Sequence, residues 1–161
     1  MTSDEYTIGK MRVQMAPAFE FFHVSVETTM PELSEAISEW MPKVFEARDE
    51  GRVPMRGAVT FIYRGMGPDA PFTLEMGFPC PPGTKPVGGA QVRRVEEFHC
   101  ASLLYTGALA HLGLAYDMLI ASMQAAGLTI GGEGRETYLV WQDDGSPNNV
   151  TMIQLGITGN D

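Results

Sequence analysis

Hydrophobic and polar positions follow a definite order through the first half of the chain. A run of aromatic and β-branched residues over 18–26 predicts a strand, and hydrophobic residues three or four apart over 33–44 predict an amphipathic helix. Two further runs of strand-forming residues follow at 58–63 and 72–78, joined by a Gly/Pro loop. The first half therefore predicts a β-α-β-β unit.

The same order returns after a Pro/Gly-rich segment at 80–89. Residues from about 92 to 105 predict a strand, and hydrophobic positions over 109–123 are again three or four apart, as on one face of a helix. Strand-forming residues at 134–141 and 150–155 complete the second set. The second half therefore predicts another β-α-β-β unit.

Local signals suggest where the helices begin and end. Thr29 and Glu32 have the spacing of a capping box, with a proline between them inside the first helical turn. Pro42 removes a backbone hydrogen bond, so we expect it to kink the first helix or to end it early. Gly127 is well placed to end the second helix in a left-handed conformation.

The duplication predicts an α+β fold in which an antiparallel sheet carries two long helices. We expect a single domain over 1–161, with modules at about 11–80 and 90–157 joined by the segment 80–89. A pseudo-twofold axis would relate these modules. A groove between them would be a natural site for a ligand.

Composition and charge exclude several classes of protein. The chain has 161 residues, is 44% hydrophobic and carries a formal charge of −9, which argues against nucleic acids or anionic membranes as partners. It has neither a run of about 18 apolar residues nor a signal peptide, so we expect a cytoplasmic protein. Its two cysteines, Cys80 and Cys100, have no metal-ligand spacing, so we expect buried thiols and no metal or cofactor.

Glu136 is the most informative single residue of the sequence. Aligning Gly57 with Gly134 places Glu136 opposite Val59, so the second half has a carboxylate where the first has an apolar side chain. Its neighbour on the same strand face, Tyr138, is amphipathic, which favours an interior or pocket-lining position. A carboxylate in such a place suits a cation receptor or a general acid/base. The alternative is a solvated carboxylate on an exposed face.

Aromatic side chains provide the second candidate feature, since they can stack on a flat ligand and hold a cation by their π-faces. The alternative for most of them is an ordinary place in the core. The candidates that accompany Glu136 are Trp40, Phe61, Tyr63, Tyr105, Tyr116, Tyr138 and Trp141.

Three short motifs in a fixed order resemble the GyrI-like (gyrase-inhibitor-like) family, also known as the bacterial transcription-activator effector-binding domain. They are Phe72-Thr73-Leu74-Glu75-Met76-Gly77-Phe78-Pro79, Tyr105-Thr106-Gly107-Ala108-Leu109 and Glu136-Thr137-Tyr138-Leu139. The resemblance extends over roughly residues 11–157. It implies two β-α-β-β modules that form a groove for a small molecule.

The resemblance also implies roles for particular residues. In multidrug-sensing members, the glutamate of an E-x-Y-L strand meets cationic aromatic drugs, and this role transfers to Glu136 and that of the tyrosine to Tyr138. Some stand-alone members are similar in pattern but hydrolyse cyclopropane-bearing DNA-alkylating compounds with the same glutamate. Only about ten residues precede the first module, so we expect no DNA-binding segment.

Three functions follow as hypotheses. The first is a stand-alone binding protein for hydrophobic compounds, cationic or aromatic, that acts by sequestration or sensing. The second is a hydrolase of cyclopropanoid genotoxic compounds, with Glu136 and Tyr138 as catalytic residues. The third is a protein-interaction module whose acidic surface binds a basic partner such as a topoisomerase.

Overall fold

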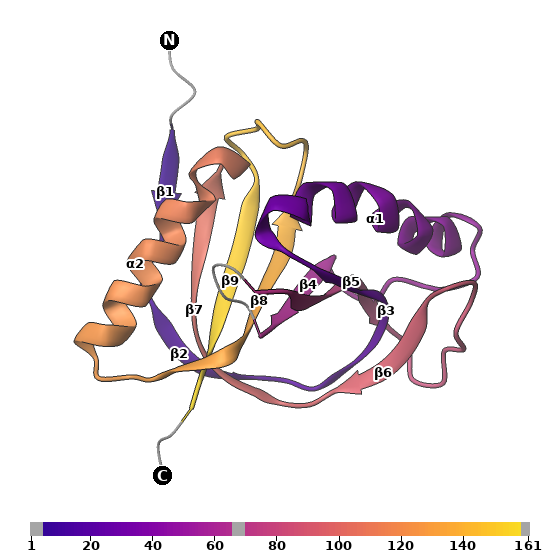
Figure 1. Cartoon of the computed structure of the whole chain (residues 1–161), viewed down its shortest axis with the longest axis horizontal. Helices are drawn as coiled ribbons and strands as arrows, with labels where there is room; N and C mark the ends of the chain where they lie inside the picture. Colours follow the sequence, from indigo (N-terminus) through magenta and orange to yellow (C-terminus); the bar gives the residue numbers. More distant parts are fainter. Residues whose placement is uncertain (1–4, 66–69, 159–161) are drawn as a thin grey trace. The chain divides into compact units, whose positions relative to one another are not determined.

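A computed structural model describes residues 5–65 and 70–158 of the chain (Figure 1). The chain divides into two compact units, which are described separately below. The terminal unit comprises Met1–Ala16 and Phe98–Asp161, and the central unit comprises Pro17–Glu97.

The central unit contains one helix and a four-stranded antiparallel sheet. Its elements are β3 (Phe19–Thr28), α1 (Leu33–Asp49), β4 (Thr60–Arg64), β5 (Phe72–Cys80) and β6 (Gln91–Val95). The strand order is β4–β5–β3–β6, and helix α1 packs against β3 and β5. The last strand of the β-α-β-β set, β5, therefore lies between the other two.

The terminal unit repeats this arrangement and adds two short strands. Its elements are β1 (Tyr6–Ile8), β2 (Arg12–Ala16), β7 (Phe98–Gly107), α2 (Leu112–Ala125), β8 (Ile130–Val140) and β9 (Val150–Ile157). Strands β1 and β2 pair with β7, which also pairs with β9, and β9 pairs with β8. As in the central unit, the last strand of the set lies between the other two.

These arrangements confirm the α+β class, the antiparallel strands, the two long helices and the repeated β-α-β-β order. The repeats are β3-α1-β4-β5 and β7-α2-β8-β9. The pseudo-twofold axis, the central groove and the single domain over 1–161 stay predictions. The units differ from the predicted modules at their ends, because β2 belongs to the terminal unit and β6 to the central unit.

The predicted single strand from about 92 to 105 is wrong. Two strands, β6 and β7, occupy this stretch, and the exposed residues Glu96 and Glu97 lie between them. Strand β6 pairs with β3, whereas β7 pairs with β1, β2 and β9. Local strand propensity does not reveal the break, because the choice of partner strand depends on residues distant in the sequence.

The helix boundaries follow the local signals in part. Thr29 makes no side-chain hydrogen bond to the helix backbone; its hydroxyl donates to a carboxylate oxygen of Glu32 at 3.3 Å, so the capping box is not formed. Helix α1 continues past Pro42 to Asp49. Gly127 has a φ of +73°, and its N–H donates to Gln124 at 3.1 Å, which confirms the predicted left-handed end of α2.

The core of the terminal unit lies between α2 and its sheet. Side chains from β7, α2 and β9 form it: Ala101, Leu103, Tyr105, Leu112, Ala115, Leu119, Met123 and Ile153. Of the residues predicted for the buried face of α1, Val44 is buried, whereas Leu33, Ile37 and Trp40 are only half-buried. Helix α2 therefore has the more extensively buried face of the two helices.

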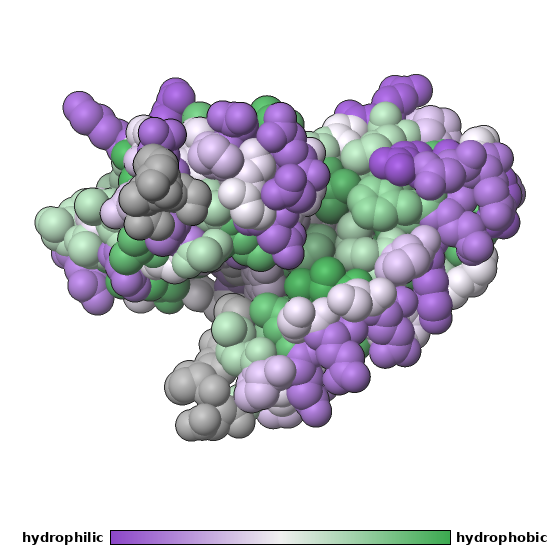
Figure 2. Space-filling view, turned by 90° about the horizontal axis from the view of Figure 1, so that it is seen from above, coloured by the Kyte–Doolittle hydropathy of each residue, from purple (hydrophilic) through white to green (hydrophobic). Residues whose placement is uncertain are grey.

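Both hydrophilic and hydrophobic residues reach the surface (Figure 2). Exposed large hydrophobic side chains include Met15, Leu114 and Met118. Among the described residues, no helix is both long enough and apolar enough to span a membrane.

Candidate functional site

Strand β8 places Glu136 on the face of the terminal sheet that α2 covers. Glu136 is paired in register with Ile153 of β9, and Ile153 with Leu103 of β7, so the three side chains lie in a row. Both Ile153 and Leu103 belong to the core beneath α2. Glu136 is accordingly buried, with 7% of its surface exposed.

Two phenol groups hold the carboxylate of Glu136. The hydroxyl of Tyr138, two residues along β8, donates to Oε1 at 2.5 Å. The hydroxyl of Tyr116, on α2, donates to Oε2 at 2.5 Å. Short hydrogen bonds to a charged acceptor are among the stronger ones in proteins, so both oxygens are fixed in orientation.

These phenols leave the negative charge of Glu136 in place. No lysine, arginine or histidine among the described residues forms an ion pair with it. The adjacent Arg135 lies on the opposite face of β8, where its guanidinium donates to Glu133 at 2.7 Å and 2.8 Å and covers the ring of Phe98. The alternative of a solvated Glu136 beside Arg135 is therefore wrong.

The other predicted aromatic residues of the terminal unit have different surroundings. The ring of Trp141 lies edge-on to Tyr138, with 5.4 Å between centroids, and is partly exposed. Tyr105 is buried, and its hydroxyl donates to the backbone oxygen of Ala108 at 2.5 Å. The structure thus brings Tyr116, Tyr138 and Trp141 together with Glu136, whereas the hydroxyl of Tyr105 has a structural partner.

Trp40, Phe61 and Tyr63 belong to the central unit. The ammonium of Lys43 lies 4.1 Å from the centre of the Trp40 ring, so this aromatic face already has a cation from its own helix. Phe61 and Tyr63 are both buried on β4, and the ring of Tyr63 lies near that of Phe72.

Sequence reasoning assigned no role to the charged cluster around Glu75 in the central unit. Glu75, on β5, is 3% exposed. Its Oε1 accepts hydrogen bonds from Arg64 at 2.7 Å and from Arg93 at 2.6 Å, and its Oε2 accepts a second bond from Arg93 at 3.0 Å. His23 Nε2 lies 3.2 Å from Oε2, as a close contact without hydrogen-bond alignment.

These partners keep Glu75 ionised. Burial alone would raise its pKa, but the contacts with His23, Arg93 and Arg64 outweigh burial and hold the pKa of Glu75 far below its ordinary value. Glu75 is therefore a neutralised carboxylate that ties β4, β5 and β6 together. One sequence signal existed, namely an acid inside the apolar run Phe72–Phe78, but its arginine partners come from other strands.

The described residues offer no metal centre. No group of three or more histidine, cysteine, aspartate or glutamate residues in the described ranges could hold a metal ion. Cys80 and Cys100 are both free and buried, and burial raises the pKa of each thiol.

No family model matches the sequence, and neither does any curated protein. Solved structures do match. The C-terminal domain of EcmrR is 14% identical, with a TM-score of 0.72, over 93% of this chain and 98% of that domain. In the complex of EcmrR with DNA, the match covers 94% of this chain, which spans only 57% of the EcmrR chain.

Two further structures have the same fold. SAV2435, solved bound to tetraphenylphosphonium, is 8% identical with a TM-score of 0.68, over 93% of this chain and 94% of that one. A hydrolase from Listeria innocua is 13% identical with a TM-score of 0.58, over 92% of each chain. The protein therefore has the fold of effector-binding domains, and the resemblance to the GyrI-like family is confirmed at the level of the fold.

Proposed function

We propose that this protein binds hydrophobic organic cations and that Glu136 neutralises the charge of the ligand. The observation that carries this proposal is the environment of Glu136. Its carboxylate is buried and hydrogen-bonded to Tyr116 and Tyr138, yet it has no cationic partner among the described residues. An uncompensated buried charge is costly, and an organic cation removes that cost.

The surrounding aromatic groups support the same ligand class. The phenol rings of Tyr116 and Tyr138 and the indole ring of Trp141 offer π-faces beside the carboxylate. Because both oxygens of Glu136 already accept a hydrogen bond, a cation with few N–H donors can bind through charge and aromatic contact alone.

The similar structures agree with this ligand class without defining it. SAV2435 has the same fold and was solved with tetraphenylphosphonium, a large hydrophobic cation. We therefore propose sequestration or sensing of such compounds. The match with EcmrR covers only part of the EcmrR chain, so nothing about DNA is transferred to this protein.

Titration with tetraphenylphosphonium tests the proposal. The variant Glu136→Gln keeps the shape of the side chain and removes its charge, so we expect the affinity measured by calorimetry to fall at least tenfold, or ~1.4 kcal/mol. Glu97→Gln removes an exposed carboxylate and serves as the matched control, with an expected change below about twofold. Equal affinities for Glu136→Gln and wild type would contradict the proposal.

Hydrolysis is a second candidate, and the phenol-bound carboxylate favours it. A buried glutamate between two hydroxyl groups can accept a proton from water, and a hydrolase from Listeria innocua has the same fold. Incubation with cyclopropane-bearing electrophiles distinguishes the two functions. Product formation that Glu136→Gln abolishes supports the hydrolase, and binding without product supports the receptor.

Binding of a basic protein such as a topoisomerase stays a prediction from the acidic composition and the resemblance. A pull-down with purified topoisomerase tests it. Binding that Glu136→Gln leaves unchanged would support an interaction surface separate from the carboxylate.

A further inference from the structure

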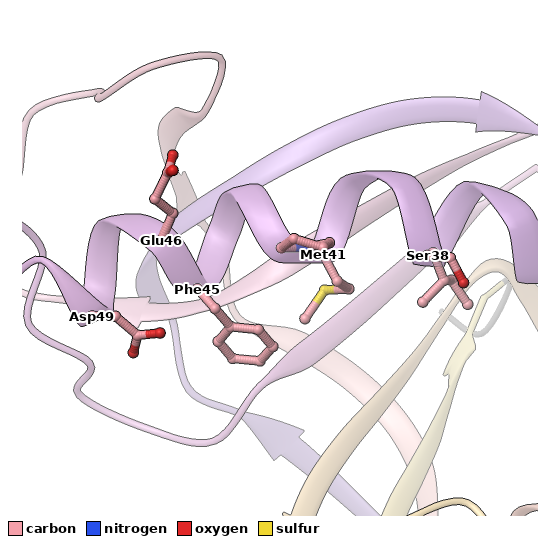
Figure 3. A pocket seen from close by; sticks show the side chains of 7 residues that line it. Ser38, Met41, Phe45, Glu46 and Asp49 are labelled. Atoms are coloured by element: carbon pink, nitrogen blue, oxygen red, sulfur yellow. The ribbon is translucent and has the colours of Figure 1, made fainter.

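One face of α1 carries a hollow of about 710 Å³. Its lining comes from this helix alone, with apolar surface from Ile37, Met41, Pro42 and Phe45 and acidic groups from Glu46 and Asp49. Phe45, Met41 and Asp49 point to the same side of the helix (Figure 3). The hollow thus joins an apolar stripe to a carboxylate at its C-terminal end.

A cation from the protein itself already occupies the charged end of this stripe. The guanidinium carbon of Arg48 lies 4.5 Å from the centre of the Phe45 ring. Its Nε and Nη2 donate to Oδ1 of Asp49 at 2.9 Å and 2.7 Å, and its Nη1 lies 4.0 Å from the sulfur of Met55. An aromatic face, a carboxylate and a thioether are groups that favour a flat cation.

These contacts are weak enough for an external cation to replace Arg48. The side chains of Arg48 and Asp49 are 38% and 62% exposed, so water and salt screen their ion pair. The apolar stripe beside them has no counterpart on Arg48 itself. A ligand that combines a flat cation with an aromatic body gains contacts with Met41 and Ile37 that the guanidinium of Arg48 does not use.

We propose that the hollow on α1 is a second binding site, specific for flat aromatic cations of the amidinium or guanidinium class, with Arg48 as its internal competitor. Phe45 and Asp49 hold the charged end of the ligand, and Met41 and Ile37 contact its ring. The site goes beyond the function proposed for Glu136, because all of its residues belong to the central unit.

Benzamidine, which is cationic at neutral pH, is a suitable probe, and the affinity of full-length protein is measured by calorimetry. In Arg48→Ala the competitor is absent, so we expect the affinity to rise about fivefold. In Phe45→Ala, or in Asp49→Asn if the first variant fails to fold, we expect a fall of about fivefold or more. Methyl resonances of Met41 report the location of the bound probe by NMR.

Arg52→Ala is the matched control, since Arg52 pairs with Glu50 at 2.6 Å, and its loss changes the net charge equally. Its affinity for benzamidine should stay within about twofold of wild type. An equal rise in Arg48→Ala and Arg52→Ala would overturn the proposal, because net charge alone would then explain it. Unchanged affinity in both Phe45→Ala and Asp49→Asn would also overturn it.

Glu136→Gln separates this proposal from the preceding one. We expect the variant to bind benzamidine like wild type, with the same shift of the Met41 methyl resonance. If it loses benzamidine binding instead, the probe binds at Glu136 and the site on α1 does not exist. Loss of tetraphenylphosphonium binding in the same variant would leave the site on α1 unaffected.

Discussion

Glu75 in the central unit and Glu136 in the terminal unit are both buried carboxylates on β-strands, but different groups surround them. Two arginines and a histidine contact Glu75. Glu136 accepts hydrogen bonds from Tyr116 and Tyr138 and has no ion pair among the described residues. Both oxygens are occupied in each case, so the difference between the two sites is the neutralising charge.

This difference separates a structural carboxylate from a functional one. A buried ion-pair network is strongly destabilised when one partner is removed, because the remaining charges stay buried without compensation. A buried carboxylate with only neutral partners already carries that cost in the native state. Such a group suits ligand binding, since an incoming cation completes what the fold has left open.

The largest expected effect comes from Glu75→Gln. This change leaves Arg64 and Arg93 without their shared carboxylate, so we expect the free energy of unfolding to fall by about 3–5 kcal/mol. Urea denaturation measures the loss, and Glu97→Gln provides an exposed control with an expected change below about 0.5 kcal/mol. A loss of the control's size would mean that the cluster around Glu75 does not stabilise the unit.

Tyr116→Phe tests the neutral partners of Glu136. The variant keeps the ring but leaves Oε2 without its donor, so we expect a destabilisation of about 1.5–3 kcal/mol in urea denaturation. Tyr6→Phe removes an exposed hydroxyl and serves as the control. In a Glu136→Gln background the cost of Tyr116→Phe should become smaller, and an unchanged cost would show that the two groups are not coupled.

The pH dependence of stability should differ between wild type and Glu75→Gln. The folded pKa of Glu75 lies below its ordinary value of 4.5, so its contribution is complete above that value and is lost as the pH falls towards the folded pKa. We expect the stability difference between the two proteins to shrink below about pH 4.5 by up to ~1.4 kcal/mol per pH unit. Denaturation at several pH values measures this, and a constant difference down to pH 3 contradicts the assignment.

The smallest expected effect has the opposite sign. Glu136→Gln removes an uncompensated buried charge, and an amide can still accept one phenol hydrogen bond and donate another. We therefore expect the free energy of unfolding to stay unchanged or to rise by up to about 1 kcal/mol. A loss above about 2 kcal/mol would place Glu136 with Glu75 as a structural carboxylate.

Much of the fold could be predicted from the sequence because hydrophobic periodicity is a local property. The spacing of Leu112, Leu119 and Met123 identified the buried face of α2, and Gly127 identified its end. The break between β6 and β7 was missed, since strand-forming residues continue almost across it. Only the pairing of β6 with β3 and of β7 with β9 shows that the stretch is two strands.

The candidate site was predictable in one respect. An acid in an apolar strand marks Glu136, and the spacing to Tyr138 follows from strand alternation. The same signal marks Glu75, yet the sequence cannot show that Arg64 and Arg93 neutralise it, because the three residues meet only through the register of β4, β5, β3 and β6.

The sequence by itself determined the order of strands and helices and the presence of an acid in β8, because these depend on neighbouring residues along the chain. Tertiary structure decided which buried carboxylate is neutralised. Tyr116 reaches Glu136 from α2, and Arg93 reaches Glu75 from β6, across strand β3. Contacts of this kind depend on packing and strand register between distant segments, and they alone distinguish the carboxylate that stabilises the fold from the one left open to a ligand.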